Sequence, residues 1–171
     1  SQMHEAIFMD FKKSEIENYM TELGAIYHEI DIACRKLKSW SKSKRVRTNL
    51  LNFPSKNFIY PQPLGVCLII GAWNYPYNVS ILPLISAIAA GNTVILKPAE
   101  YTSITALLFA QICIEAGIPK GVINIVTGDG TTGSLITKHK SINKIAFTGS
   151  TEVGRKIRFE TAGTGKSLTL E

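Results

Sequence analysis

Four short stretches of the sequence carry side chains suited to chemistry, and each lies at or directly after an apolar run. The stretch GAWNYP contains Asn74, whose side-chain amide can donate hydrogen bonds. The stretch ILKPAE contains Lys97 and Glu100, and SLTLE ends in Glu171. The stretch GSTEVG spans residues 149–154. These groups could bind an anion or sugar hydroxyls, and Asn74 is either part of a well-packed turn or held in place for catalysis.

The stretch GSTEVG has the composition of a phosphate-binding turn. An apolar run leads into Gly149 and Ser150, and a helical pattern follows. Free backbone N–H groups and the helix dipole at such a turn attract anions. The stretch departs from the dinucleotide fingerprint GxGxxG because Thr151 replaces the middle glycine. Anion binding and a simple capped turn, with Gly154 allowing close packing of helix on strand, both remain open.

Lys97 and Glu100 form a candidate pair for hydroxyl groups. Pro98 biases Lys97 towards an extended conformation, so the lysine should project where its strand ends. A carboxylate accepts hydrogen bonds and an ammonium donates them, which suits a ribose. The alternative is an ordinary Lys–Glu pair on the surface beside a helix start.

Apolar runs and helical patterns alternate through the second part of the chain. Strands are predicted at Val66–Ile70, Thr93–Lys97, Val122–Val126, Ile142–Phe147 and Leu168–Leu170. Helices are predicted at Val79–Ala90, Ser103–Ala116, Thr132–Lys138 and Glu152–Thr161. Strands that are apolar on both faces and alternate with helices indicate a parallel sheet covered by helices. The predicted fold class is therefore α/β, a doubly wound, Rossmann-like sheet with helices on both faces, which binds ligands at the carboxyl ends of its strands.

The first part of the chain is predicted to be helical and then extended. Ser14 and Glu17 form a capping box, and apolar spacing predicts one long helix over 14–40 after a shorter one over 4–11. The pattern is irregular from 46 to 63, where three prolines predict an arm that is not central in a sheet. We expect three parts: an N-terminal helical segment over 1–49, an extended arm over 50–64 and the doubly wound domain over 65–171.

Composition and charge favour an ordinary globular protein. The chain has 171 residues, of which 45% are hydrophobic and 19% charged, and its net charge is +6. Much of that charge lies in one stretch: Arg35, Lys36, Lys38, Lys42, Lys44, Arg45 and Arg47. Because aromatic residues do not interleave there, we predict a solvated helix end and loop, with no nucleic-acid partner.

The cysteines predict neither a disulfide nor a metal site. Cys34, Cys67 and Cys113 are widely spaced, odd in number and set in apolar patterns, with no CxxC pair. Buried free thiols in a reducing cytoplasm fit this pattern best. No apolar run reaches the roughly 20 residues of a membrane span, and no signal peptide is evident. We therefore expect a cytoplasmic protein without a membrane anchor.

The ordered motifs GAWNYP, ILKPAE, GSTEVG after AFT, and SLTLE resemble those of aldehyde dehydrogenases. The flanking stretches PLGVCLII and AIAAGNTVILKPAE strengthen the resemblance, which covers essentially the whole chain. The basic helix and LLNFPSKNF are similar to class 3-type members, which act on medium- and long-chain or aromatic aldehydes.

This resemblance implies that residues 65–171 bind NAD, with NADP possible. The implied cofactor contacts are Trp73, Lys97, Glu100, Gly149, Ser150, Thr151, Val153 and Gly154. Ser150 and the adjacent N–H groups would face the pyrophosphate, and Trp73 would flank the cleft. Glu100 would favour NAD by accepting a hydrogen bond from the ribose 2′-hydroxyl and repelling a 2′-phosphate.

The resemblance also implies the catalytic roles. Asn74 would stabilise an oxyanion on a cysteine-bound aldehyde, and Glu171 would be the base for thioester hydrolysis. A carboxylate partly buried at the end of its strand would suit that base. The implied nucleophilic cysteine lies beyond Glu171, so residues 1–171 alone are expected to be inactive.

Other readings of the same motifs remain. A naturally short, non-catalytic nucleotide-binding module is the main alternative, and the gene sequence past Glu171 would discriminate the two. A CoA-acylating relative is less favoured because such enzymes lack this type of glutamate. The resemblance further implies a homodimer or homotetramer, with the arm in the interface, and an aldehyde substrate.

Overall fold

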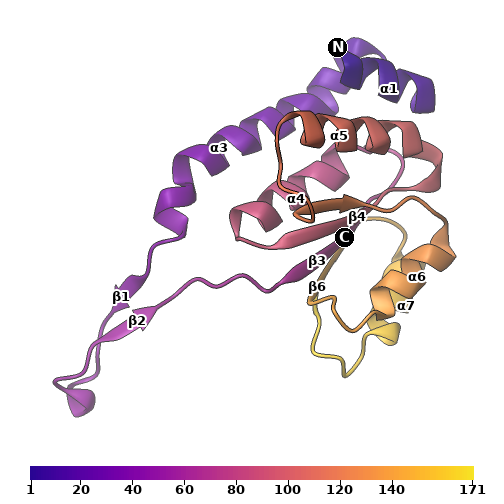
Figure 1. The fold of residues 1–171 in the computed structure, drawn as a ribbon. Coiled ribbons are helices and arrows are strands. Elements are labelled where there is room, and N and C mark those ends of the chain that lie inside the picture. Colours follow the sequence, from indigo (N-terminus) through magenta and orange to yellow (C-terminus); the bar gives the residue numbers. More distant parts are fainter.

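A five-stranded parallel sheet forms the centre of the computed structural model, which describes all residues 1–171 (Figure 1). Its strands are β3 (Val66–Ile70), β4 (Thr93–Lys97), β5 (Ile123–Ile125), β6 (Lys144–Phe147) and β7 (Ser167–Leu170). Their order is β5-β4-β3-β6-β7, and every neighbouring pair is parallel. The chain thus runs outward from β3 to β5 and then crosses back to β6. The predicted doubly wound, Rossmann-like fold is confirmed, with its switch point between β3 and β6.

Helices cover both faces of the sheet. They are α4 (Asn78–Ala89), α5 (Ser103–Glu115), α6 (Gly130–Lys138) and α7 (Thr151–Glu160). Successive side chains of β3 point to opposite faces. Ile69 packs with Leu84 of α4, whereas Leu68 packs with Ile145 and with Ile157 of α7. Each face of β3 is therefore buried, which explains its uninterrupted apolar sequence.

The N-terminal helices pack on α4 and α5 as an additional layer. They are α1 (Gln2–Phe11), α2 (Glu15–Asn18), a π-helical turn η1 (Tyr19–Leu23) and α3 (Gly24–Trp40). The helix predicted over 14–40 is thus continuous but contains a π turn, closed by the Gly24 N–H on the Tyr19 carbonyl. The extra residue in that turn shifts the helical phase. Glu22 is buried within this turn, whereas Ile16 and Met20 are exposed.

Two carboxylates of this N-terminal layer cap helices of the sheet layers. Neither α4 nor α5 receives a side-chain cap from its own N-cap residue. Instead Asp10 Oδ2 accepts hydrogen bonds from the Thr105 N–H and hydroxyl, both at 2.7 Å. Glu22 Oε2 accepts from the N–H groups of Tyr77 at 2.7 Å and Asn78 at 3.2 Å. Backbone N–H groups at the start of both helices therefore find their hydrogen-bond acceptors in a distant part of the chain.

A two-stranded antiparallel ribbon projects away from the rest of the molecule (Figure 1). It consists of β1 (Lys44–Val46) and β2 (Asn57–Ile59), with a short 3₁₀ turn η2 (Leu50–Asn52) near its tip. The ribbon begins within the segment expected to be helical and before the arm expected over 50–64. All residues of both strands are exposed, so no alternation of apolar and polar residues marks them in the sequence.

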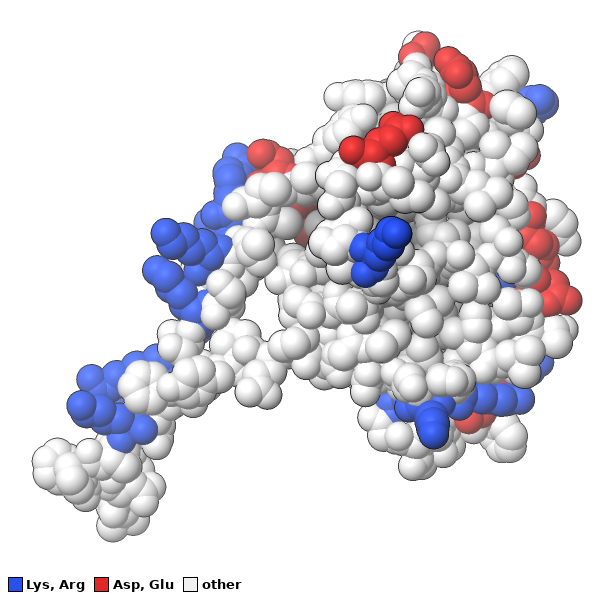
Figure 2. All heavy atoms as spheres, in the orientation of Figure 1, with Lys and Arg blue, Asp and Glu red and all other residues white.

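Lys and Arg side chains gather over the end of α3 and the base of this ribbon (Figure 2). The basic stretch 35–47 is exposed throughout, as expected for a solvated surface. None of the helices combines the length and apolar character that crossing a bilayer requires.

Candidate functional site

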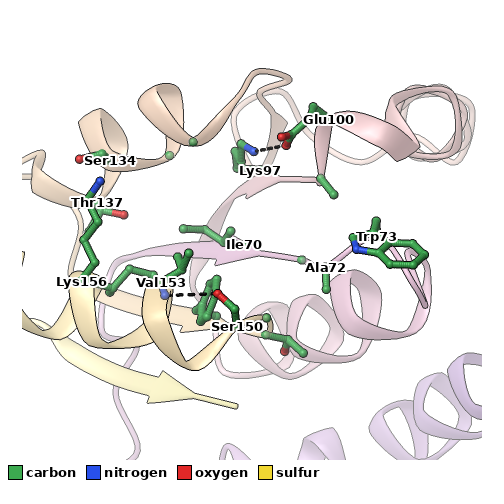
Figure 3. A pocket seen from close by; sticks show the side chains of 18 of the residues that line it. Ile70, Ala72, Trp73, Lys97, Glu100, Ser134, Thr137, Ser150, Val153 and Lys156 are labelled. Atoms are coloured by element: carbon green, nitrogen blue, oxygen red, sulfur yellow. Dashed lines mark hydrogen bonds and ion pairs between the residues drawn. The ribbon is translucent and has the colours of Figure 1, made fainter.

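The carboxyl ends of the central strands open into a cleft of about 650 Å³ (Figure 3). Its walls come from the turns after β3, β4 and β6 and from α6 and α7. The predicted site residues that line it are Trp73, Asn74, Lys97, Glu100, Gly149, Ser150, Val153 and Glu171. Thr151 and Gly154 do not line it. The structure therefore brings most of the predicted site residues into a single cavity at the edge of the sheet where doubly wound folds bind ligands.

Lys97 and Glu100 face each other at the end of β4. Lys97 is buried, and its Nζ lies 3.5 Å from Glu100 Oε2, whereas the Glu100 side chain is 47% exposed. The lysine side chain runs past Gly133 of α6, where a Cβ would lie 4.0 Å from its Cδ and Cε. Because the ion pair is long, both groups keep hydrogen-bonding capacity for a ligand in the cleft.

The turn GSTEVG lies on the opposite side of the cleft from Lys97 and Glu100, with Ile70 between them (Figure 3). Ser150 is the N-cap of α7, and its Oγ accepts a hydrogen bond from the Val153 N–H at 3.3 Å. The earlier N–H groups of the first turn have no acceptor within the helix. The structure thus contains a capped turn, and that turn also presents free N–H groups to an anion.

The two glycines of this turn have different surroundings. A Cβ on Gly149 would lie 2.6 Å from Cζ of the Phe147 ring, so this position requires glycine. Gly154 is buried next to the same ring, but a Cβ there would lie at an ordinary 3.7 Å from it. It packs α7 on the sheet, and exposed Thr151 also lies away from the cleft because the helix turns it outward. Any effect of the Thr151 side chain on a ligand in this cleft is therefore indirect.

The turn after β3 places Asn74 and Trp73 at the cleft. Gly71 lets this turn pass close to α4, because a Cβ there would lie 2.5 Å from Ser80 Oγ. Trp73 is 49% exposed and packs edge-on against Phe11 of α1, with ring centroids 5.3 Å apart. The Asn74 side chain is exposed and makes no hydrogen bond within the chain. Its amide is therefore available to a ligand.

Glu171 lines the same cleft from the end of β7. Its N–H donates to the Phe147 carbonyl at 2.9 Å, and its carbonyl accepts from the Gly149 N–H at 3.0 Å. The side chain is exposed, which differs from the partial burial that we expected. Strand β7 is at the edge of the sheet, and its residues alternate between half-buried and exposed, with Glu171 continuing on the exposed side.

Four polar residues of α6 and α7 that line the cleft were missed by sequence reasoning. They are Ser134 and Thr137 of α6 and Lys156 and Glu160 of α7. Ser134 Oγ lies 3.0 Å from Glu160 Oε1, and the buried Thr137 Oγ1 has no hydrogen-bond partner. Their helical spacing places each pair on one face of its helix. The sequence holds no signal that these two faces meet.

Comparison with known proteins decides the family. A profile of the Aldehyde dehydrogenase family matches residues 4–171. The chain belongs to this family. It is 35% identical over 162 residues to 4-trimethylaminobutyraldehyde dehydrogenase A of Danio rerio, covering 93% of this chain and 32% of that protein. It is 43% identical over 119 residues to betaine aldehyde dehydrogenase of Vibrio vulnificus, covering 68% of this chain and 24% of that protein.

A solved aldehyde dehydrogenase structure has the same fold as this chain. The substrate-bound state of Staphylococcus aureus AldH superposes with a TM-score of 0.92 at 36% identity, covering 99% of this chain and 36% of that one. The predicted resemblance to the aldehyde dehydrogenase family is therefore confirmed. The chain spans about a third or less of the length of the curated relatives that it matches.

The cleft of this aldehyde dehydrogenase chain suits a dinucleotide such as NAD(P). Its volume of about 650 Å³ lies within the usual range for ligand sites. The Lys97–Glu100 pair can bind ribose hydroxyls, and the first turn of α7 can bind a pyrophosphate. The unpartnered Thr137 hydroxyl is a buried polar atom at the cleft that a polar ligand could satisfy.

None of the three cysteines lines the cleft. Burial raises the pKa of the Cys67 thiol, an effect that Lys144 partly opposes, and burial also raises the pKa of the Cys113 thiol. Both are packed in the core, as expected, and are poor thiolate nucleophiles. Cys34 is exposed, although we expected it to be buried. Helix α4 covers the face of α3 that carries Ala33, and Cys34 points away from that face.

We expect alkylation to separate these thiols. In the native protein near pH 8, iodoacetamide should modify Cys34 at least about 10-fold faster than Cys67 or Cys113, because alkylation requires an accessible thiolate. Peptide mapping by mass spectrometry measures each site, and the denatured protein serves as the control in which all three react. Rapid native modification of Cys67 would contradict the structure.

Proposed function

We propose that the protein containing this chain oxidises an aldehyde to a carboxylic acid with NAD(P)⁺. Family membership supports aldehyde oxidation in general. The observation that carries the proposal for these residues is the single cleft lined by Asn74, the Lys97–Glu100 pair, Ser150 and Glu171. The groups that we assign as oxyanion donor, ribose pair, pyrophosphate turn and carboxylate base line one cavity, which supports the proposal.

The first half-reaction makes use of Asn74. A cysteine thiolate from outside residues 1–171 adds to the aldehyde carbon, and the carbonyl oxygen becomes an oxyanion. The Asn74 amide donates a hydrogen bond to that oxygen, where negative charge develops. A nicotinamide cofactor, held by Lys97, Glu100 and the turn at Gly149 and Ser150, would supply the hydride acceptor that oxidation of this carbon to a cysteine thioester needs. Trp73 and residues 147–150 line the same cleft as Asn74.

The second half-reaction makes use of Glu171. Its carboxylate takes a proton from water as the water oxygen attacks the thioester carbonyl. The carbon–sulfur bond then breaks, which releases the carboxylic acid and restores the cysteine.

The direct test is a scan of aldehydes with NAD⁺ and NADP⁺, using the full-length protein. Formation of the reduced cofactor is followed by absorbance, and the carboxylic acid product by mass spectrometry. Turnover that depends on an aldehyde supports the proposal. Tight binding of NAD⁺ without turnover of any aldehyde would instead favour a non-catalytic nucleotide-binding module.

Glu100 is expected to set the preference between the two cofactors. In the Glu100→Gln variant, we expect the ratio of kcat/KM for NAD⁺ to that for NADP⁺ to fall about 10-fold, because one charged hydrogen-bond acceptor and one source of repulsion are removed. Glu115→Gln is the matched control, because this exposed glutamate lies at the far end of α5. An unchanged ratio would remove Glu100 from the ribose site.

The projecting ribbon supports a homodimer or homotetramer as part of this proposal. Leu50, Leu51 and Phe53 near its tip are 89%, 90% and 80% exposed. Large apolar side chains gathered at this exposure are typical of protein–protein contacts. A two-stranded ribbon is also only marginally stable by itself, which favours its packing against another subunit.

A further inference from the structure

A buried ion pair lies directly behind the turn that carries Asn74. Lys13 follows α1 and Glu22 lies in the π turn, and these residues are 3% and 0% exposed. Lys13 Nζ is 2.6 Å from Glu22 Oε1. Buried ion pairs add little to stability compared with apolar residues of similar volume. We therefore look for the role of Lys13 and Glu22 in their hydrogen bonds to the surrounding backbone.

Both members of the pair hold the backbone after β3. Lys13 Nζ donates a hydrogen bond to the Asn74 carbonyl at 3.1 Å and lies 4.2 Å from the ring centroid of Tyr75. The second oxygen of Glu22 accepts from the N–H groups of Tyr77 and Asn78. The pair thus spans the second part of the turn, from the carbonyl of Asn74 to the N–H groups of Tyr77 and Asn78 at the start of α4.

The orientation of the Asn74 side-chain amide depends on the backbone of this turn. The amide has no hydrogen bond of its own within the chain, so no neighbouring side chain orients it. Helix α4 also lacks a cap from its own N-cap residue. The charged hydrogen bonds from the pair are strong and directional, and they hold the backbone of the turn from Asn74 to Asn78.

The backbone conformation at the end of α1 places Lys13 next to Glu22 and the turn. Lys12 is the only non-glycine residue with a positive φ, at 57°, and it ends α1 in the left-handed conformation. That conformation reverses the chain, so that Lys12 is exposed and Lys13 is buried. Lys13 then meets Glu22, which lies in the π turn on the buried side of its helix.

We propose that Lys13 and Glu22 are positioning residues for the oxyanion site. They hold the backbone of residues 74–78, so that the Asn74 amide is already placed where the oxyanion forms. Such preorganisation is the main source of oxyanion stabilisation in enzymes. This inference rests on the proposed function, because it assigns the pair a role through Asn74.

The test is the Lys13→Met variant of the full-length enzyme. We expect kcat to fall about 10- to 100-fold, since a displacement near 1 Å has that effect on a reacting geometry. The Kd for NAD⁺ should stay within about twofold, because the ribose pair and the α7 turn are untouched. Hydrogen exchange at the Tyr77 and Asn78 amides should become faster. Lys12→Met is the matched control, and it should leave all of these values unchanged.

A second variant guards against simple misfolding. Lys13→Met leaves Glu22 buried and unpaired, whereas Lys13→Met/Glu22→Gln removes both charges and keeps an oxygen for the α4 N–H groups. The double variant should have a Tm close to that of the wild type and still show the lowered kcat. A normal kcat in a folded double variant would overturn the proposal.

Coupling to Asn74 separates positioning from general destabilisation. If the pair acts through Asn74, adding Lys13→Met to Asn74→Ala should lower kcat no further. Additive losses would overturn the proposal. If Asn74→Ala itself left kcat intact, the proposed oxyanion role would fail and take this inference with it. If only Lys13→Met left kcat intact, the inference alone would fail.

Discussion

Replacing Asn74 with alanine in the full-length enzyme is expected to lower kcat by about 10²- to 10³-fold, or roughly 3–4 kcal/mol of barrier. The amide lines the cleft and makes no hydrogen bond within the chain, so its removal leaves the fold without an unsatisfied partner. The loss should therefore fall on the chemical step, with little change in the KM for NAD⁺. Steady-state kinetics with a saturating aldehyde measure it.

The Asn74→Asp variant sharpens this test. Aspartate has almost the same shape but carries no N–H donor, and its charge would repel an oxyanion. It should therefore be at least as inactive as the alanine variant. Gln111→Ala removes an exposed amide of α5 and serves as the control. Full activity in Asn74→Ala, or activity retained in Asn74→Asp, would show that the turn is only a packing element.

Replacing Glu171 with glutamine is expected to block hydrolysis while the first half-reaction proceeds. Glutamine keeps the size of the side chain but cannot accept the proton from water. Steady-state kcat should fall about 10²- to 10⁴-fold, the usual contribution of a general base. Rapid mixing should still show a burst of about one reduced cofactor per active subunit, because an acyl-enzyme accumulates.

Mass spectrometry of the intact Glu171→Gln protein checks the same point directly. The protein should gain the mass of the acyl group after reaction with aldehyde and NAD⁺. Glu152→Gln is the control, because Glu152 is exposed in the first turn of α7 and does not line the cleft. A variant that hydrolyses its thioester at the normal rate would exclude Glu171 as the base.

The elements that position the cleft could be predicted from the sequence because each depends on a short, continuous stretch of residues. Strands β3 and β4 have the predicted bounds, since each is a short apolar run between glycine or asparagine and a turn residue. Lys97 and Glu100 are three residues apart, so their meeting follows from one strand end and one turn. The structure outside the sheet was harder to predict from the sequence. The π turn and the ribbon strand β1 leave no periodic signal, because one adds a residue within a helix and the other is exposed on both faces.

The rest of the site depends on contacts between distant parts of the chain. Lys13 and Asn74 are 61 residues apart, and nothing near either residue predicts their hydrogen bond. A lysine or a glutamate in a helical pattern is usually exposed, so burial of Lys13 and Glu22 contradicts the ordinary expectation for their types. Such pairs become visible only when the layers of the fold are assembled.

The carboxylates that cap α4 and α5 from the N-terminal layer also define the unit that folds. The bonds from Thr105 to Asp10 and from Tyr77 to Glu22 join residues 95 and 55 positions apart. Until the N-terminal helices dock, the first turns of both helices lack these acceptors and are free to fray. The N-terminal helices and the sheet domain, which the ribbon joins, are therefore expected to unfold together as one cooperative unit. A nucleotide-binding domain cut free at residue 65 would lose the contacts that complete its own helices.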